Sequence, residues 1–155
     1  DLGLPFTIHA GEAAGPESIQ QALMLGAKRI GHGIYAIEDT DLLTQLSQNQ
    51  IPLVLCFTSN LQTKAVNGVQ AYPICRLLEL GIPVTVNTDN MTVSGTCLHR
   101  EYTLLQEAFG LSADTLQAIA CNAAAAAFVS QDQAAELKKQ ITQGFASWLR
   151  ASVKE

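Results

Sequence analysis

Four short apolar runs alternate with amphipathic stretches over the first two thirds of the chain. The runs are rich in Ile, Val, Leu and Phe, residues that favour strands, and they are short enough for buried strands. They occupy residues 5–9, 27–33, 51–57 and 82–90. The stretches between them repeat apolar residues at helical spacing, which predicts helices near residues 16–25, 40–48 and 70–80.

Each predicted strand leads into polar residues at its end. His9 and Glu12 follow the first strand, His32 the second, Asn60 the third and Asp89 the fourth. His9, His32, Asn60 and Asp89 lie 23, 28 and 29 residues apart, which is the length of a strand, a crossover helix and a return strand. We therefore expect four parallel strands that present these polar residues at one edge.

This layout predicts an α/β fold, the C-terminal half of a (β/α)8 TIM barrel with crossover helices. Barrel active sites lie at the C-terminal ends of the strands, and a complete barrel has roughly 250 residues. We expect the half barrel over residues 1–110 and C-terminal helices packing on it over residues 111–155, with the N-terminal half missing before Asp1. A doubly wound sheet is the alternative, but no Gly-x-Gly-x-x-Gly turn follows the first strand.

Composition and charge narrow the class of partner. The 155 residues carry a net charge of -5, and the nine Lys and Arg are scattered, which argues against nucleic acid and anionic membranes. A small-molecule ligand is the expectation instead. The four cysteines lack a Cys-x-x-Cys pair, which predicts buried, reduced thiols in a cytoplasmic protein.

The strand-end residues combine the side chains of a metal-assisted hydrolase. Imidazole and carboxylate groups bind Zn²⁺ while leaving a position for water, and a further acid or base can then move protons. His9, Glu12, His32 and Asp89 supply this mixture, although spacing alone does not say which histidine binds the metal. Taken singly, His9 could be a core histidine and Glu12 a carboxylate at a helix N-terminus.

Other polar residues have structural alternatives of equal weight. Ser59 and Asn60 could cap the segment after the third strand or contact a substrate, and Asn90 could be a turn residue. His99 lies on a later predicted helix and is expected to pack on the surface rather than to bind a metal. The zinc signature of cytidine deaminases, His-x-Glu followed by Pro-Cys-x-x-Cys, is absent from the sequence.

Four motifs follow the strands in order: His9-Ala10-Gly11-Glu12, Arg29-Ile30-Gly31-His32-Gly33, Thr58-Ser59-Asn60 and Asn87-Thr88-Asp89. Together they resemble the motifs of the adenosine deaminase family, within the metal-dependent amidohydrolase superfamily. Ser94-Gly95-Thr96 followed by Arg100-Glu101-Tyr102 points toward its adenosine-specific members.

The resemblance implies a role for each strand-end residue. His9 and Asp89 would be zinc ligands, and Asp89 would also take a proton from the zinc-bound water. Glu12 would protonate the purine ring nitrogen beside the attacked carbon, and His32 would orient and stabilise the hydroxide. The implied reaction converts adenosine to inosine and ammonia, and 2′-deoxyadenosine to 2′-deoxyinosine and ammonia, in purine metabolism.

The sequence also departs from the family pattern. The first-strand His-x-His zinc pair has no counterpart, and Asn90 stands where many members have a second aspartate. The resemblance makes Gly11 and Asn90 substrate-binding residues, and an amide at residue 90 cannot titrate. We expect the chain alone to be inactive and to self-associate through two unpaired strand edges. The alternatives are an adenine or other aminopurine deaminase, or a non-catalytic half barrel for binding or assembly.

Overall fold

The computed structural model describes residues 3–152, which fold around a four-stranded parallel sheet. Neighbouring strands in the sheet follow one another in the chain, and every pair is parallel, as predicted. All the strands are shorter than the apolar runs that predicted them. They are β1 (Thr7–Ala10), β2 (Arg29–His32), β3 (Leu53–Leu55) and β4 (Val84–Val86).

The strands β3 and β4 begin directly after prolines. Pro52 and Pro83 cannot donate to the sheet, but the Pro52 carbonyl accepts from Ile30 and the Pro83 carbonyl from Leu53, both at 3.0 Å. The strand β3 ends early because α3 (Phe57–Gln62) starts two residues later. The polar residues that follow this apolar run therefore lie on a helix.

The helices between the strands follow the predicted order. The helix α1 (Pro16–Met24) has proline in its first turn, and α2 (Thr40–Gln48) is capped by Asp39. The prediction of a single helix near residues 70–80 was wrong. This segment is divided into a 3₁₀ turn, η2 (Val69–Ala71), and α4 (Ile74–Glu79), because Pro73 lies between them. A further 3₁₀ turn, η1 (Ile34–Glu38), follows β2.

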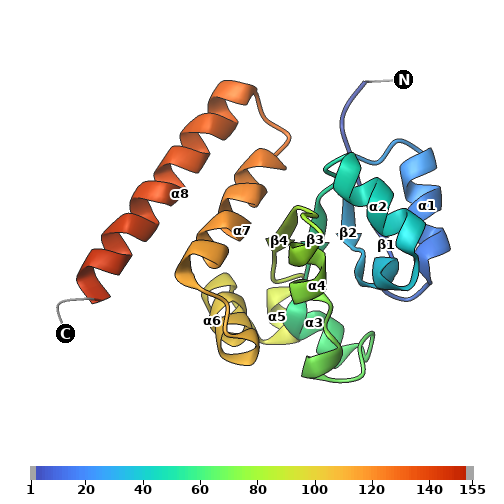
Figure 1. The fold of residues 1–155 in the computed structure, drawn as a ribbon, viewed down its shortest axis with the longest axis horizontal. Helices are drawn as coiled ribbons and strands as arrows, with labels where there is room; N and C mark the ends of the chain where they lie inside the picture. Colours follow the sequence, from blue (N-terminus) through green and yellow to red (C-terminus); the bar gives the residue numbers. More distant parts are fainter. Residues whose placement is uncertain (1–2, 153–155) are drawn as a thin grey trace.

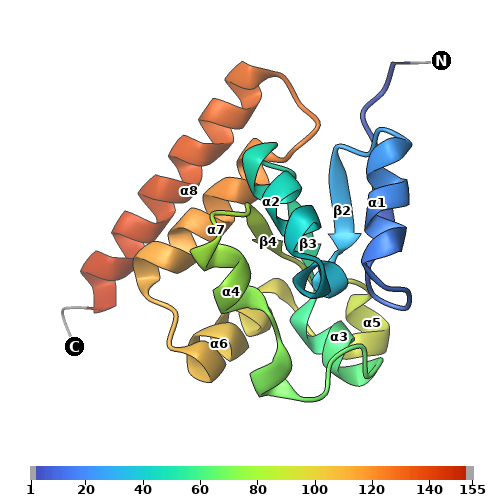
Figure 2. The ribbon, with the colours of Figure 1, turned by 45° about the vertical axis from the view of Figure 1, so that its right-hand side comes forward.

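Four helices follow β4. Figure 1 and Figure 2 both place α7 and α8 beyond β4, on the side of the sheet opposite α1. The side chain of Asn122, on α7, donates to the Val84 carbonyl at 3.1 Å, and Arg29 donates to the Ala126 carbonyl at 2.8 Å. The helix α7 therefore attaches directly to the sheet, and α8 packs on α7. The four are α5 (Met91–Ser94), α6 (Leu98–Phe109), α7 (Ala113–Ala125) and α8 (Gln131–Ser152).

The sheet has a buried core and two open edges among the described residues. Ile30, Leu53 and Val84, from three strands, are fully buried, whereas β1 and β4 each pair with a single strand. None of the described helices is long and apolar enough to cross a membrane. The four cysteines are free, but the prediction that they are buried holds only for Cys56, since Cys97 is exposed.

Candidate active site

The site lies at the C-terminal ends of the strands, and Glu12 is its centre. Its Oε2 accepts a hydrogen bond from His9 Nε2 at 2.7 Å. Its Oε1 accepts from Asn60 Nδ2 at 3.0 Å and from Thr63 Oγ1 at 3.3 Å, and lies 3.5 Å from His32 Nδ1. Side chains from the ends of three different strands thus meet at one carboxylate, as the regular spacing of polar residues at the strand ends predicted.

His32 is the buried histidine of this group. Its side chain is 4% exposed, and its Nδ1 accepts a hydrogen bond from Asn60 Nδ2 at 2.9 Å. The neutral ring therefore carries its proton on Nε2. Burial lowers the pKa of His32 from its ordinary value of 6.5; Glu12 opposes this shift, His9 adds to it, and Asp89 opposes it. The neutral form is thus favoured.

Two of the polar strand-end residues have left-handed backbones. His32 has φ 63° and Asp89 has φ 54°, a region that side chains with a Cβ rarely adopt. Such strain persists only where surrounding contacts hold it, and it concentrates at functional sites. Residue 11, with φ 68°, has to be a glycine, because a Cβ at this position would lie 2.7 Å from Ile19 Cγ1 and 3.1 Å from Gly33 Cα. The same backbone region also occurs just after the ends of α2 and α3, so it supports a functional role for this edge only together with the side-chain contacts.

Asp89 and Asn90 lie on the exposed side of the site. Asp89 Oδ2 accepts from Ser59 Oγ at 2.7 Å. The Asn90 side chain caps α5 by accepting from the backbone N–H groups of Thr92 at 3.1 Å and Val93 at 3.0 Å. The structure thus gives Asn90 the turn role that the sequence left open, and substrate contact by Asn90 or Gly11 stays a prediction.

The side chains of His9, Glu12 and His32 are of the types that bind metal ions. One nitrogen or oxygen from each of His9, Glu12 and His32 lies within 4.8 Å of the others, and imidazole with carboxylate is a donor set that zinc accepts. Asp89 is outside this trio. His9 Nε2 already donates to Glu12, so that nitrogen can hold an ion only after this hydrogen bond opens. The assignment of His9 and Asp89 as the zinc ligands stays a prediction.

Two residues of α3, Ser59 and Asn60, contact the site. The sequence left open whether they cap a segment or contact a substrate. Asn60 is fully buried and Ser59 nearly so, and they contact Glu12, His32 and Asp89 instead of capping a loop. The signal was their position directly after a buried apolar run. Thr63 carried no such signal, since only the helical turn of α3 brings it back to the site.

Cys56 lies near these carboxylates but cannot serve as a nucleophile at neutral pH. Burial, with the negative charges of Asp89, Glu101 and Glu12, raises the pKa of its thiol to about 12. The thiol therefore stays protonated, whereas a nucleophilic cysteine reacts as the thiolate. Covalent thiol chemistry at this site is thus disfavoured.

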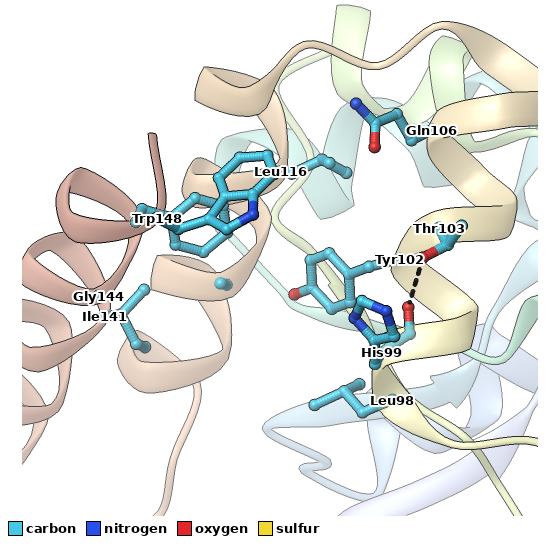
Figure 3. A pocket seen from close by; sticks show the side chains of 11 residues that line it. Leu98, His99, Tyr102, Thr103, Gln106, Leu116, Ile141, Gly144 and Trp148 are labelled. Atoms are coloured by element: carbon cyan, nitrogen blue, oxygen red, sulfur yellow. Dashed lines mark hydrogen bonds between the residues drawn. The ribbon is translucent and has the colours of Figure 1, made fainter. Parts of the chain in front are cut away.

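A separate cavity of about 560 Å³ lies between α6, α7 and α8. Figure 3 shows Tyr102, Leu116, Ile141 and Trp148 around it. Its lining includes His99 from the exposed face of α6, in keeping with a surface role for that residue. Among the described residues, this lining holds no carboxylate, whereas a carboxylate and two histidines meet at the strand ends.

The family profile described as adenosine deaminase matches residues 1–144. The chain belongs to the adenosine deaminase family. It is 51% identical over 143 residues to an adenosine deaminase from Haemophilus ducreyi, covering 92% of this chain and 42% of that protein. An adenosine deaminase from Klebsiella pneumoniae is 42% identical over 145 residues, with coverages of 93% and 44%. The chain thus spans less than half the length of these curated relatives.

Solved structures identify the fold as part of a barrel. The adenine deaminase from Arthrobacter aurescens superposes with a TM-score of 0.88 at 31% identity, covering 96% of this chain and 44% of that one. A zinc-bound amidohydrolase from Burkholderia ambifaria gives a TM-score of 0.90 at 19% identity, with coverages of 99% and 43%. Because the chain matches only part of these (β/α)8 amidohydrolases, it is a partial barrel, and the barrel prediction is confirmed.

Proposed function

We propose that the protein at its full natural length hydrolyses the 6-amino group of adenosine and 2′-deoxyadenosine in a zinc-dependent reaction. Water adds at C6 of the purine and ammonia leaves, giving inosine from adenosine. The observation that carries this proposal is the position of Glu12, a carboxyl group held by Asn60 and Thr63 beside two histidines. Family membership and relatives called adenosine deaminase support it.

Some residues of the site are proposed to bind the metal, and others to act on the purine and the attacking water. His9 and Asp89 would hold the zinc ion, which supplies Lewis acidity when bound. Glu12 donates a proton to the ring nitrogen beside C6, and Asp89 accepts one from the attacking water. His32 is fixed by Asn60 with its Nε2–H free to orient that water.

The test is ammonia release by the full-length protein with adenosine, 2′-deoxyadenosine and adenine as substrates. We expect turnover of both nucleosides, loss of activity after zinc chelation, and recovery when zinc is returned. No turnover of either nucleoside by the zinc-loaded protein would refute the proposal. Preferred turnover of adenine would support an aminopurine deaminase instead, the activity named for a structural neighbour at 31% identity.

The 155-residue chain alone is proposed to be inactive and to self-associate. Its sheet presents β1 and β4 as open edges, and Leu4 and Phe6 beside β1 are 69% and 41% exposed. Open edges and exposed apolar side chains favour pairing with another copy. Light scattering should report a dimer or larger species, and a monodisperse monomer would contradict this. Sustained assembly by the full-length protein without any deamination would favour the non-catalytic alternative.

A further inference from the structure

A second carboxylate near the site is completely buried. Glu101, on α6, has no exposed surface, and among the described residues no Lys, Arg or His forms an ion pair with it. A buried carboxylate is costly to desolvate, and an apolar side chain of similar volume would pack at lower cost. Its presence therefore calls for a role other than filling the core.

Glu101 caps the start of α3 from outside that helix. Its Oε2 accepts from the Thr58 backbone N–H at 3.1 Å, and its Oε1 accepts from the Thr58 hydroxyl. Thr58 is the second residue of α3, and the residue before the helix, Cys56, provides no side-chain cap. The first N–H groups of a helix have no partner within it. Glu101 thus satisfies one of them across 43 residues of sequence.

The same carboxylate also holds the segment after β4. Thr96 Oγ1 donates to Glu101 Oε1 at 2.6 Å, in a contact that is buried. This segment and α3 are joined again where Gln62 donates to the Ser94 carbonyl at 3.0 Å. Glu101 therefore ties together the two segments that follow β3 and β4, the strands whose ends supply Asn60 and Asp89.

The residues that follow Thr58 on α3 make the contacts of the site. Ser59 donates to Asp89 at 2.7 Å, and Asn60 donates to Glu12 and to His32. The helix has only six residues, so a shift of its first turn moves both donors. Catalytic geometry is sensitive to such shifts, and a displacement of about 1 Å can lower the rate by about 100-fold.

We propose that Glu101 is a positioning residue, which fixes the first turn of α3 so that Asn60 and Ser59 hold Glu12, His32 and Asp89 in register. It touches none of the reacting groups and acts through Thr58 and Thr96. Its effect on turnover rests on the proposed deaminase function, whereas its effect on the geometry of the site does not.

The test compares Glu101→Gln, Glu101→Ala and Thr96→Val in the full-length protein. The matched control is Glu107→Gln, which removes an exposed carboxylate from the same helix. The first readout is the ¹⁵N shift of the His32 ring in metal-free protein, assigned with a His32→Gln variant. The second is the separate measurement of kcat and KM for adenosine.

We expect Glu101→Ala to lower kcat about 100-fold with KM changed less than threefold, in line with misplaced catalytic groups. Glu101→Gln, which keeps one acceptor oxygen, should lose less than Glu101→Ala, and Thr96→Val least. The His32 shifts should move in the same order, because Nδ1 loses its hydrogen bond from Asn60. If Glu101→Ala does not fold, the other two variants carry the same readouts.

A purely structural Glu101 would give the opposite pattern. The variants would then melt at lower temperature, yet the folded protein would keep kcat and the His32 shifts at the wild-type values, and this result would overturn the inference. If the wild type fails to deaminate adenosine, the proposed function fails. The His32 shifts still decide whether Glu101 positions α3.

Discussion

The two histidines of the site have opposite surroundings. The His32 side chain is 4% exposed and receives a hydrogen bond from the buried Asn60. The His9 side chain is 63% exposed and has Glu12 as its polar partner. Asp89 resembles His9 in this respect, since it is exposed and is held through Ser59.

This difference divides the site into a buried, hydrogen-bonded side and an exposed side. Glu12 and His32, proposed to donate a proton and to orient water, have side chains 12% and 4% exposed and are connected through Asn60. His9 and Asp89, proposed to bind zinc, are exposed. The chain spans less than half of its curated relatives, and the exposed side is where additional ligands would have to enter.

Replacing the proposed proton donor should have the largest effect. In the full-length protein, Glu12→Gln should lower kcat for adenosine by about 10²–10⁴-fold, the usual contribution of a general acid. An amide cannot donate the carboxyl proton, although its oxygen can still accept from Asn60. Ammonia release is the measurement, with Glu107→Gln as the control. A kcat within about threefold of wild type would refute the role of Glu12.

Removing the central amide should destabilise the buried side. Asn60→Ala should lower the free energy of unfolding by about 1–3 kcal/mol, because it removes the donor to the buried His32 Nδ1 and one of the two donors to Glu12 Oε1. Urea denaturation measures the change. Asn67→Ala, at an exposed loop position, is the control and should be near neutral. Equal effects of the two substitutions would show that the buried network adds no stability.

Stability should depend on pH through His32. Its folded-state pKa lies below 6.5 because burial disfavours the charged ring, so the unfolded chain takes up the proton first as pH falls. The stabilising contribution is therefore complete above about pH 6.5 and is lost as pH falls through that value toward the folded-state pKa. Unfolding measured in metal-free protein should show this slope in the wild type and in His99→Gln. His32→Gln should lack it; an unchanged slope in that variant would contradict the assignment.

The smallest effect is expected at Asn90. Asn90→Asp should change the free energy of unfolding by less than about 0.5 kcal/mol, because aspartate caps a helix as well as asparagine. Asn90→Ala, which removes the cap on α5, should cost about 1 kcal/mol. Thermal denaturation compares the two. A loss from aspartate as large as that from alanine would mean that Asn90 has a partner beyond its cap.

The fold was predictable where the sequence pattern is local and repeated. Apolar runs followed by polar residues at regular intervals predicted four parallel strands and a partial barrel, and both are confirmed. The error near residues 70–80 came from following the apolar spacing through Pro73, whose missing N–H divides the helix. The bounds of β3 were also missed, because Phe57 continues the apolar run yet belongs to α3.

The site was only partly predictable for a related reason. The regular spacing of the strand ends predicted that His9, Glu12, His32 and Asp89 would meet. The first three do, whereas Asp89 is held by Ser59. The spacing did not predict that Asn60 would bridge Glu12 and His32. That contact depends on α3 starting two residues after β3, and its start is held by Glu101 from 43 residues away. The left-handed backbones of His32 and Asp89 were not predicted either, because histidine and aspartate are enriched in this region yet adopt it only in a minority of cases.

The central claim is the division of labour between His9 on the metal and Glu12 on the purine, and zinc content tests it most directly. In the full-length protein, Glu12→Gln should retain about one zinc per chain while losing turnover, and His9→Ala should lose both. Because Glu12, His9 and His32 are themselves close enough to bind an ion, the opposite result is physically accessible. Loss of zinc from Glu12→Gln with zinc retained by His9→Ala would contradict the account.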